Sequence, residues 1–130
     1  VLAGRAHTDW RQVLVAGAAG TAIHSGARAL GVVGQAQGAD CVAAGNLLAT
    51  AAVPAAMVAV FDATPGHLAD RLMAALAAGL AAGGEAGPVR SAGLKVADRL
   101  SWPLVDLRCD WDEAPVGRLA EAWAVYRPQM

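Results

Sequence analysis

Charged residues alternate with apolar ones in the segment Asp106-Leu107-Arg108-Cys109-Asp110. In an extended strand alternate side chains share a face, so the two carboxylates and the guanidinium would line up together. Two carboxylates beside a guanidinium could hold a polar substrate or orient a catalytic group. An ion-paired solvent face opposite a buried face gives the same pattern, and many sheets have one. Spacing alone leaves both interpretations open and favours the structural one.

Two further polar side chains follow glycines in predicted loops. Asn46 comes after Gly45 at the end of a predicted strand, and Glu85 comes after Gly83-Gly84. An exposed amide beside a turn can donate to an oxyanion, but it can equally stabilise the turn itself. A loop carboxylate is more often solvated than functional. We therefore keep Asn46, Glu85, Asp106 and Arg108 as candidate substrate-binding residues and assign no catalytic residue.

The histidines and glycine clusters predict no metal or cofactor site. His7, His24 and His67 lack the i, i+4 spacing of a helical metal pair. His67 falls in the predicted first turn of a helix, where a cation is disfavoured, so we expect it to face solvent. The glycines between residues 31 and 38 match neither the dinucleotide nor the phosphate-loop spacing and predict tight turns.

Composition limits the class of protein. The chain has 130 residues, 56% of them hydrophobic and many of these alanine, which fits one domain with a modest core. The net charge is −1 without a Lys/Arg run, which argues against nucleic acid or an anionic membrane surface as a partner. No apolar run is long enough to span a bilayer, and two cysteines without metal spacing predict free thiols in a cytoplasmic protein.

Hydrophobic patterning predicts short strands followed by helices. Strands are expected over residues 12–16, 21–24, 29–33, 41–44, 91–97 and 103–110. Thr50 is the expected N-cap of a helix that runs to Asp62, and Thr64-Pro65 is the expected start of the next.

The second helix carries the clearest periodicity, and a third follows near the end of the chain. Leu68, Leu72, Leu76 and Leu80 recur every four residues, which predicts a buried stripe. Gly83-Gly84 ends that helix. Pro115 opens the last one, in which Val116, Leu119 and Trp123 share a face.

Several landmarks along the chain together resemble a known family. They are Arg11-Gln12, Gly45-Asn46-Leu47-Leu48-Ala49, Ala56-Met57, the run from Leu68 to Glu85, Ser91-Ala92, and Asp106-Leu107-Arg108 with Asp110 and Pro115. The chain resembles the domain of unknown function ten-twenty-eight family, an uncharacterised group of the N-terminal-nucleophile (Ntn) hydrolase superfamily. The resemblance runs from about Arg11 to Trp123, and the Ala-Ala-Gly-Gly-acid segment is its most specific part.

The resemblance implies an α+β fold of the αββα sandwich type. Residues 1–130 would form a single domain that is the C-terminal portion of this sandwich and supplies its later strands and helices. The resemblance also implies a bacterial soluble protein whose activity is undefined at family level. The first hypothesis is a hydrolase that acts on an amide or related C–N bond in a small-molecule substrate. In Ntn hydrolases an N-terminal Thr, Ser or Cys attacks the amide carbonyl of the substrate. The side chain of Val1 has no nucleophilic atom. We therefore expect the nucleophile on a missing N-terminal segment or a partner subunit, and an oligomer.

Departures from the family pattern favour a second hypothesis. Glu85 replaces the usual Asp, and Gly87-Pro88 replaces an Arg-Gly pair. Ala44 stands where a Gln usually precedes Gly-Asn, and the usual Asp-His-Pro is absent before Pro115. A non-catalytic subunit or small-molecule-binding domain that keeps the scaffold is thus the alternative to the hydrolase-like protein.

Overall fold

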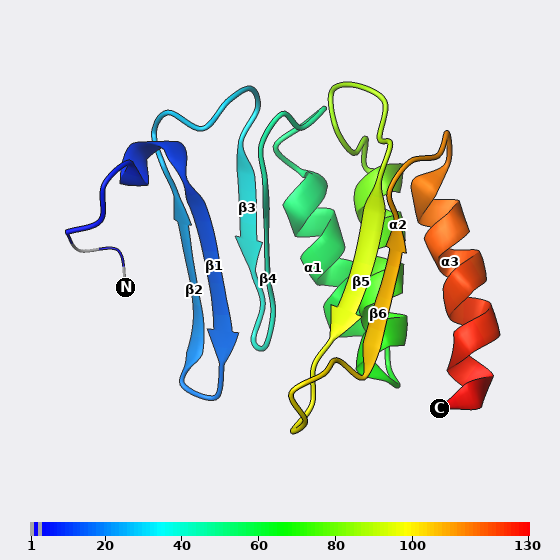
Figure 1. The fold of residues 1–130 in the computed structure, drawn as a ribbon. Helices are drawn as coiled ribbons and strands as arrows, with labels where there is room; N and C mark the ends of the chain where they lie inside the picture. The colour runs from blue at the N-terminus through cyan, green and yellow to red at the C-terminus, as the bar shows by residue number, and fades with distance from the viewer. Residues whose placement is uncertain (1, 3) are drawn as a thin grey trace.

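The chain has a mixed α+β fold built from short hairpins and helices (Figure 1). The structure is a computed structural model, and it describes residues 2 and 4–130. Within these residues there are three α-helices and three two-stranded antiparallel sheets. In Figure 1, α1 lies between β4 and β5, α2 lies behind the hairpin β5–β6, and α3 lies beside β6.

The first hairpin agrees with the sequence prediction. Strands β1 (Gln12–Gly17) and β2 (Gly20–Ser25) pair in register, with Gly17 opposite Gly20 across a two-residue loop. Gly20 has a φ of +113°, a conformation that glycine adopts without a steric penalty. A short 3-10 helix, η1 (Thr8–Trp10), precedes this hairpin.

The strand predicted over residues 29–33 is wrong, and the second hairpin begins after it. Strands β3 (Gly34–Gln37) and β4 (Val42–Gly45) form that hairpin. The carbonyl groups of Leu30 and Val32 instead accept hydrogen bonds from the amides of Leu47 and Leu48, each at 3.0 Å. The segment is a loop because its backbone bonds to another loop rather than to a strand.

Helix α1 (Val53–Ala63) packs against the β3–β4 hairpin. Its N-cap is Ala52 rather than the predicted Thr50, whose hydroxyl accepts from the Ala52 amide at 3.3 Å within the preceding turn. A Cβ at Gly34 would lie 2.7 Å from the Ala51 carbonyl oxygen, so the close approach of hairpin and helix requires glycine there.

Helix α2 (Leu68–Ala81) starts later than predicted, because Thr64 belongs to the preceding helix. Thr64 is the C-cap of α1, and its hydroxyl donates to the Val60 carbonyl at 2.6 Å. His67 is the N-cap of α2, since its Nδ1 accepts from the Ala69 amide at 3.1 Å. The His67 ring also stacks on Trp123 with centroids 5.9 Å apart, so the expectation that it simply faces solvent is wrong.

The buried face of α2 is not the predicted leucine stripe. Leu68 and Leu80 are 43% and 46% exposed, and Leu72 and Leu76 only pack against the edge of the core. The buried positions are Ala69, Met73, Ala75 and Gly79. Three of these four residues are small, and at Gly79 the close approach of α1 requires it, because a Cβ there would lie 2.8 Å from Cγ of Met57.

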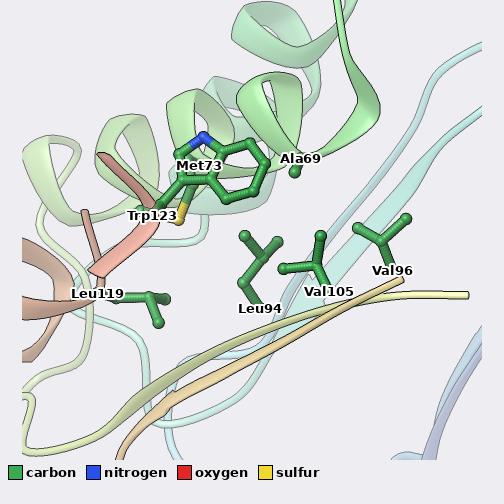
Figure 2. Close-up of a cluster of buried hydrophobic side chains, with 7 residues drawn as sticks. All are labelled: Ala69, Met73, Leu94, Val96, Val105, Leu119 and Trp123. Carbon is green, nitrogen blue, oxygen red and sulfur yellow. The ribbon is translucent and has the colours of Figure 1, made fainter. Parts of the chain in front are cut away.

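The third hairpin, β5 (Ala92–Val96) with β6 (Val105–Cys109), forms the main core with α2 and α3. Helix α3 (Pro115–Tyr126) opens at the predicted proline and buries the predicted Val116, Leu119 and Trp123; the 3-10 helix η2 (Arg127–Gln129) follows. Figure 2 shows the helix side chains Ala69, Met73 and Trp123 opposite Leu94, Val96 and Val105 from the strands.

Among the described residues, no helix is long and apolar enough to cross a membrane. Cys41 and Cys109 are both free thiols and partly buried. Burial raises the pKa of the Cys41 thiol most, and the nearby carboxylate of Asp62 raises it further.

Candidate functional site

Three loops meet at one end of the hairpins and are joined through their backbones. On one side of the loop after β4, the amides of Leu47 and Leu48 donate hydrogen bonds to the carbonyls of Leu30 and Val32. On its other side the Ala49 amide donates to the Gly84 carbonyl at 3.0 Å, and the Ala86 amide donates to the Leu47 carbonyl at 2.7 Å. We call residues 30–32, 46–49 and 84–86 the loop junction.

Leu47 occupies the centre of the loop junction in an unusual conformation. Its φ of +54° lies in the left-handed region, which a leucine seldom adopts. Gly31 accommodates it, because a Cβ there would lie 2.9 Å from Cδ2 of Leu47. Backbone strain of this kind persists only where the surroundings enforce it, and it concentrates at functional sites.

Asn46 lines a cavity of about 240 Å³ on one side of the loop junction. Its lining mixes an aromatic ring, a guanidinium, two carboxamides and aliphatic side chains: Trp10, Gln12, Arg28, Ala29, Leu30 and Asn46. We call this the Asn46 cavity. A mixture of apolar walls with a few polar groups is typical of small-molecule sites.

Glu85 lines a second cavity, of about 180 Å³, on the other side of the loop junction. Leu48, Val53, Met57, Leu76, Val89 and Val116 contribute most of its apolar walls. Glu85 and Ser91 are its polar side chains. We call this the Glu85 cavity; it lies between α1, α2 and the loops that lead to β5.

Asp106 and Arg108 share the exposed face of β6, as strand alternation predicts. Asp106 lies 3.9 Å from Arg108 and 3.7 Å from Lys95 on the paired strand, and the Arg108 side chain is 73% exposed. Neither residue lines the Asn46 cavity or the Glu85 cavity. The loop junction thus brings the backbones next to Asn46 and Glu85 together, whereas Asp106 and Arg108 form a separate ion-paired surface.

Within residues 2 and 4–130, no cluster of three His, Cys, Asp or Glu side chains could hold a metal ion. Arg127 donates three hydrogen bonds to the Asp70 carboxylate, and neither residue lines either cavity. Hydrogen bonds from Arg127, and then from Trp123, lower the pKa of Asp70. These charges fasten one helix to another and do not face either cavity.

The comparisons with known proteins agree with the landmarks in the sequence. A family model described as a family of unknown function, DUF1028, matches residues 1–119. The chain belongs to this family. The crystal structure of a DUF1028 protein from Silicibacter pomeroyi matches with a TM-score of 0.82 and 28% identity over 94% of this chain. The match covers 53% of that protein, so the chain spans about half of its length. No curated protein matched.

The remaining cavity residues of this DUF1028 chain were not predicted from the sequence. Trp10, Arg28 and Leu30 line the Asn46 cavity, yet none lies in a recognisable motif. Gln12 belongs to the Arg11-Gln12 landmark but was not a candidate site residue. These residues come from the segment before β1, from β1 itself and from the β2–β3 loop. The only sequence signal was the set of glycines that allow these loops to approach one another.

Proposed function

We propose that this DUF1028 chain is the C-terminal portion of an Ntn-hydrolase-like protein that acts on an amide or related C–N bond. The observation that supports it best is the hydrogen bond from the Ala86 amide to the Leu47 carbonyl. This bond lies one residue from Asn46 and one residue from Glu85. Two polar side chains from distant loops therefore start from neighbouring backbones, beside the strained Leu47.

The chemistry of the two side chains suits amide hydrolysis. A carboxamide such as that of Asn46 can donate a hydrogen bond to the oxyanion that forms when an amide carbonyl is attacked. A carboxylate such as that of Glu85 can accept or return a proton, or orient the substrate. The nucleophile would come from another segment or subunit.

The free strand edges support completion of the fold by such a segment. Within the described residues, β4 pairs as a strand only with β3, and β5 only with β6. Edges of this kind are normally paired or covered in a folded protein. Additional strands at these edges, from an N-terminal segment or from another subunit of an oligomer, would extend the small sheets towards an αββα sandwich.

A non-catalytic binding domain is the alternative, and one observation favours it. Asn46 and Glu85 line different cavities, so a single small substrate would need the completing segment to bring it into contact with both. A domain that only binds would need no such arrangement.

The test is hydrolysis of small amides by the full-length protein, measured as release of the amine. We expect Asn46→Ala to lower kcat by about 100-fold, the usual effect of removing an oxyanion donor. Glu85→Gln should lower kcat as well, whereas Glu121→Gln on the exposed face of α3 should not. Amine release by none of the amides, or equal rates for the wild-type protein and both site variants, would leave the binding domain as the function.

A further inference from the structure

We propose that the Asn46 cavity binds a small carboxylic acid with a flat apolar group, and that Arg28 holds the carboxylate. The inference goes beyond hydrolysis because it requires no bond to be broken. It also involves Trp10, Gln12 and Leu30, which the proposed hydrolytic chemistry does not use.

Arg28 differs from the other arginines that contact aromatic rings. Among the described residues, three guanidinium groups lie over rings: Arg28 over Trp10 at 5.6 Å, Arg71 over Phe61 at 3.9 Å, and Arg90 over Trp111 at 5.5 Å. The Nε of Arg71 donates to the Phe61 carbonyl at 3.2 Å, and Arg90 pairs with Glu113 at 2.5 Å.

The guanidinium of Arg28 lacks such a partner. In the part of the chain that the structure describes, it makes neither an ion pair nor a side-chain hydrogen bond. It lines the Asn46 cavity as an exposed side chain, so its donors are open to a ligand. A guanidinium has a planar fork of donors that matches the two oxygens of a carboxylate. The cavity therefore offers a site for a carboxylate at its cationic wall.

The apolar walls of the cavity suit a flat group next to that carboxylate. Trp10 is 55% exposed and Leu30 is 60% exposed, although both line the cavity. An aromatic ring that stacks on an indole gains from its area and from the preferred offset geometry. A bound ring would cover surface that both side chains now leave open to water.

Two carboxamides supply the remaining polar contacts. The Gln12 Nε2 donates to the Ser25 hydroxyl at 3.0 Å and to the Gly45 carbonyl at 3.1 Å. These bonds fix the Gln12 amide, so its oxygen remains as an acceptor for a ligand N–H. Asn46 adds a second amide that can donate or accept. A ligand with an amide between its carboxylate and its ring would use every polar group of the cavity.

The loops that carry Trp10 and Arg28 are held together before any ligand binds. The Arg28 amide donates to the Asp9 carbonyl at 2.7 Å, and the Gly26 amide donates to the Arg11 carbonyl at 2.9 Å. The His24 Nε2 lies 3.0 Å from the Thr8 carbonyl oxygen. A site that is already ordered loses less entropy when it binds a ligand. A single guanidinium also balances the single charge of a carboxylate better than the higher charge of a phosphate.

The probe is hippurate (N-benzoylglycine), which joins a carboxylate, an amide and a phenyl ring, and its methyl ester is the uncharged control. Binding to the full-length protein is measured by isothermal titration calorimetry. We expect saturable binding of hippurate with a Kd on the order of 1 mM, as for a ligand of this size with one charged contact. The ester should bind at least about tenfold more weakly, since it cannot form the charge-assisted pair with Arg28.

Matched variants separate the cavity from the rest of the surface. Arg28→Ala should weaken hippurate binding by about tenfold or more. Arg28→Lys should retain only part of the wild-type affinity, because an ammonium lacks the planar fork of donors of a guanidinium. Trp10→Leu should weaken binding, whereas Trp111→Leu, at the other exposed arginine–tryptophan contact, should not. Arg99→Ala in the β5–β6 loop is the charge control. Equal melting temperatures for the Arg28 variants and the wild-type protein exclude a folding effect.

Three results would overturn the proposal. They are no saturable binding of hippurate at about ten times the expected Kd, equal binding by the Arg28→Ala and wild-type proteins, and displacement of hippurate by inorganic phosphate as readily as by benzoate. Release of glycine from hippurate would concern the hydrolytic function and not the cavity. Binding without glycine release would support the carboxylate site while leaving hydrolysis unsupported, so the two proposals fail separately.

Discussion

The indole Nε1 of Trp123 donates a hydrogen bond of 2.9 Å to Oδ1 of Asp70, although 53 residues separate them in the chain. Arg127 donates to both oxygens of the same carboxylate, with distances of 2.8 to 3.0 Å. Asp70 lies in the first turn of α2, and its two partners lie in α3 and immediately after it. One carboxylate therefore fastens the C-terminal helix to the core.

Acid should weaken this attachment. Arg127 and Trp123 hold the pKa of Asp70 below its ordinary value of 3.8. A lowered pKa in the folded state stabilises the protein fully above pH 3.8, and the stabilisation is lost as the pH falls through the folded-state pKa. We expect Asp70→Asn to lower the melting temperature at pH 7 and to flatten its decline below about pH 4.

Asp98→Asn is the control for that experiment, because Asp98 is exposed and makes no ion pair with any described residue. It should leave both the melting temperature and its pH dependence as in the wild-type protein. The pKa of Asp112 is also lowered, mainly by the hydrogen bond from the Ala114 amide and further by Arg118. Asp112 therefore contributes separately to the decline of the melting temperature in acid. An unchanged acid profile in Asp70→Asn would contradict the role of the Asp70 attachment.

The burial pattern predicts which leucines carry stability. Leu119 is 1% exposed at the centre of the core, so Leu119→Ala should lower the free energy of unfolding by about 2–5 kcal/mol. Leu68 is 43% exposed, and Leu68→Ala should cost less than about 1 kcal/mol. Urea denaturation of the two variants measures the difference. Similar losses would mean that the leucine stripe of α2 is buried after all.

Two glycines should respond to alanine in opposite directions. A Cβ at Gly26 would collide with the backbone of Asp9, which cannot move without breaking the loops beside the Asn46 cavity. Gly26→Ala should therefore destabilise the protein by about 1–3 kcal/mol. A Cβ at Gly117 in α3 would meet nothing within 4 Å, so Gly117→Ala should stabilise by about 0.4–1 kcal/mol. Thermal denaturation of both variants gives the two signs. An unchanged or raised melting temperature in Gly26→Ala would contradict the packing at Gly26.

Arg108→Ala tests the remaining candidate residue. The side chain is exposed and its carboxylate contact is long, so the change should alter the free energy of unfolding by only about 0–1 kcal/mol. We also expect no effect on amide hydrolysis or on hippurate binding, since Arg108 lines neither cavity. A loss of hydrolysis or of hippurate binding at an unchanged melting temperature would mean that the exposed face of β6 belongs to the functional site.

Much of the local structure could be predicted from the sequence because it depends on neighbours in the chain. Alternation predicted the exposed charges of β6, glycines predicted the turn between β1 and β2, and Pro115 predicted the start of α3. The buried face of α3 also followed from its helical spacing. Each of these features is determined by a few adjacent residues.

Tertiary contacts decided the rest. Periodicity predicted a leucine stripe on α2, but close approach by α1 selected the small face with Ala75 and Gly79. Residues 29–33 have the composition of a strand but form a loop, because their carbonyls accept hydrogen bonds from the amides of Leu47 and Leu48 in another loop. The candidate cavity depends most on the fold, since Trp10, Arg28 and Asn46 come from three separate segments of the chain. The sequence alone could identify Asn46 as a polar residue after a turn, but only the packing of those loops puts a guanidinium and an indole in the same cavity.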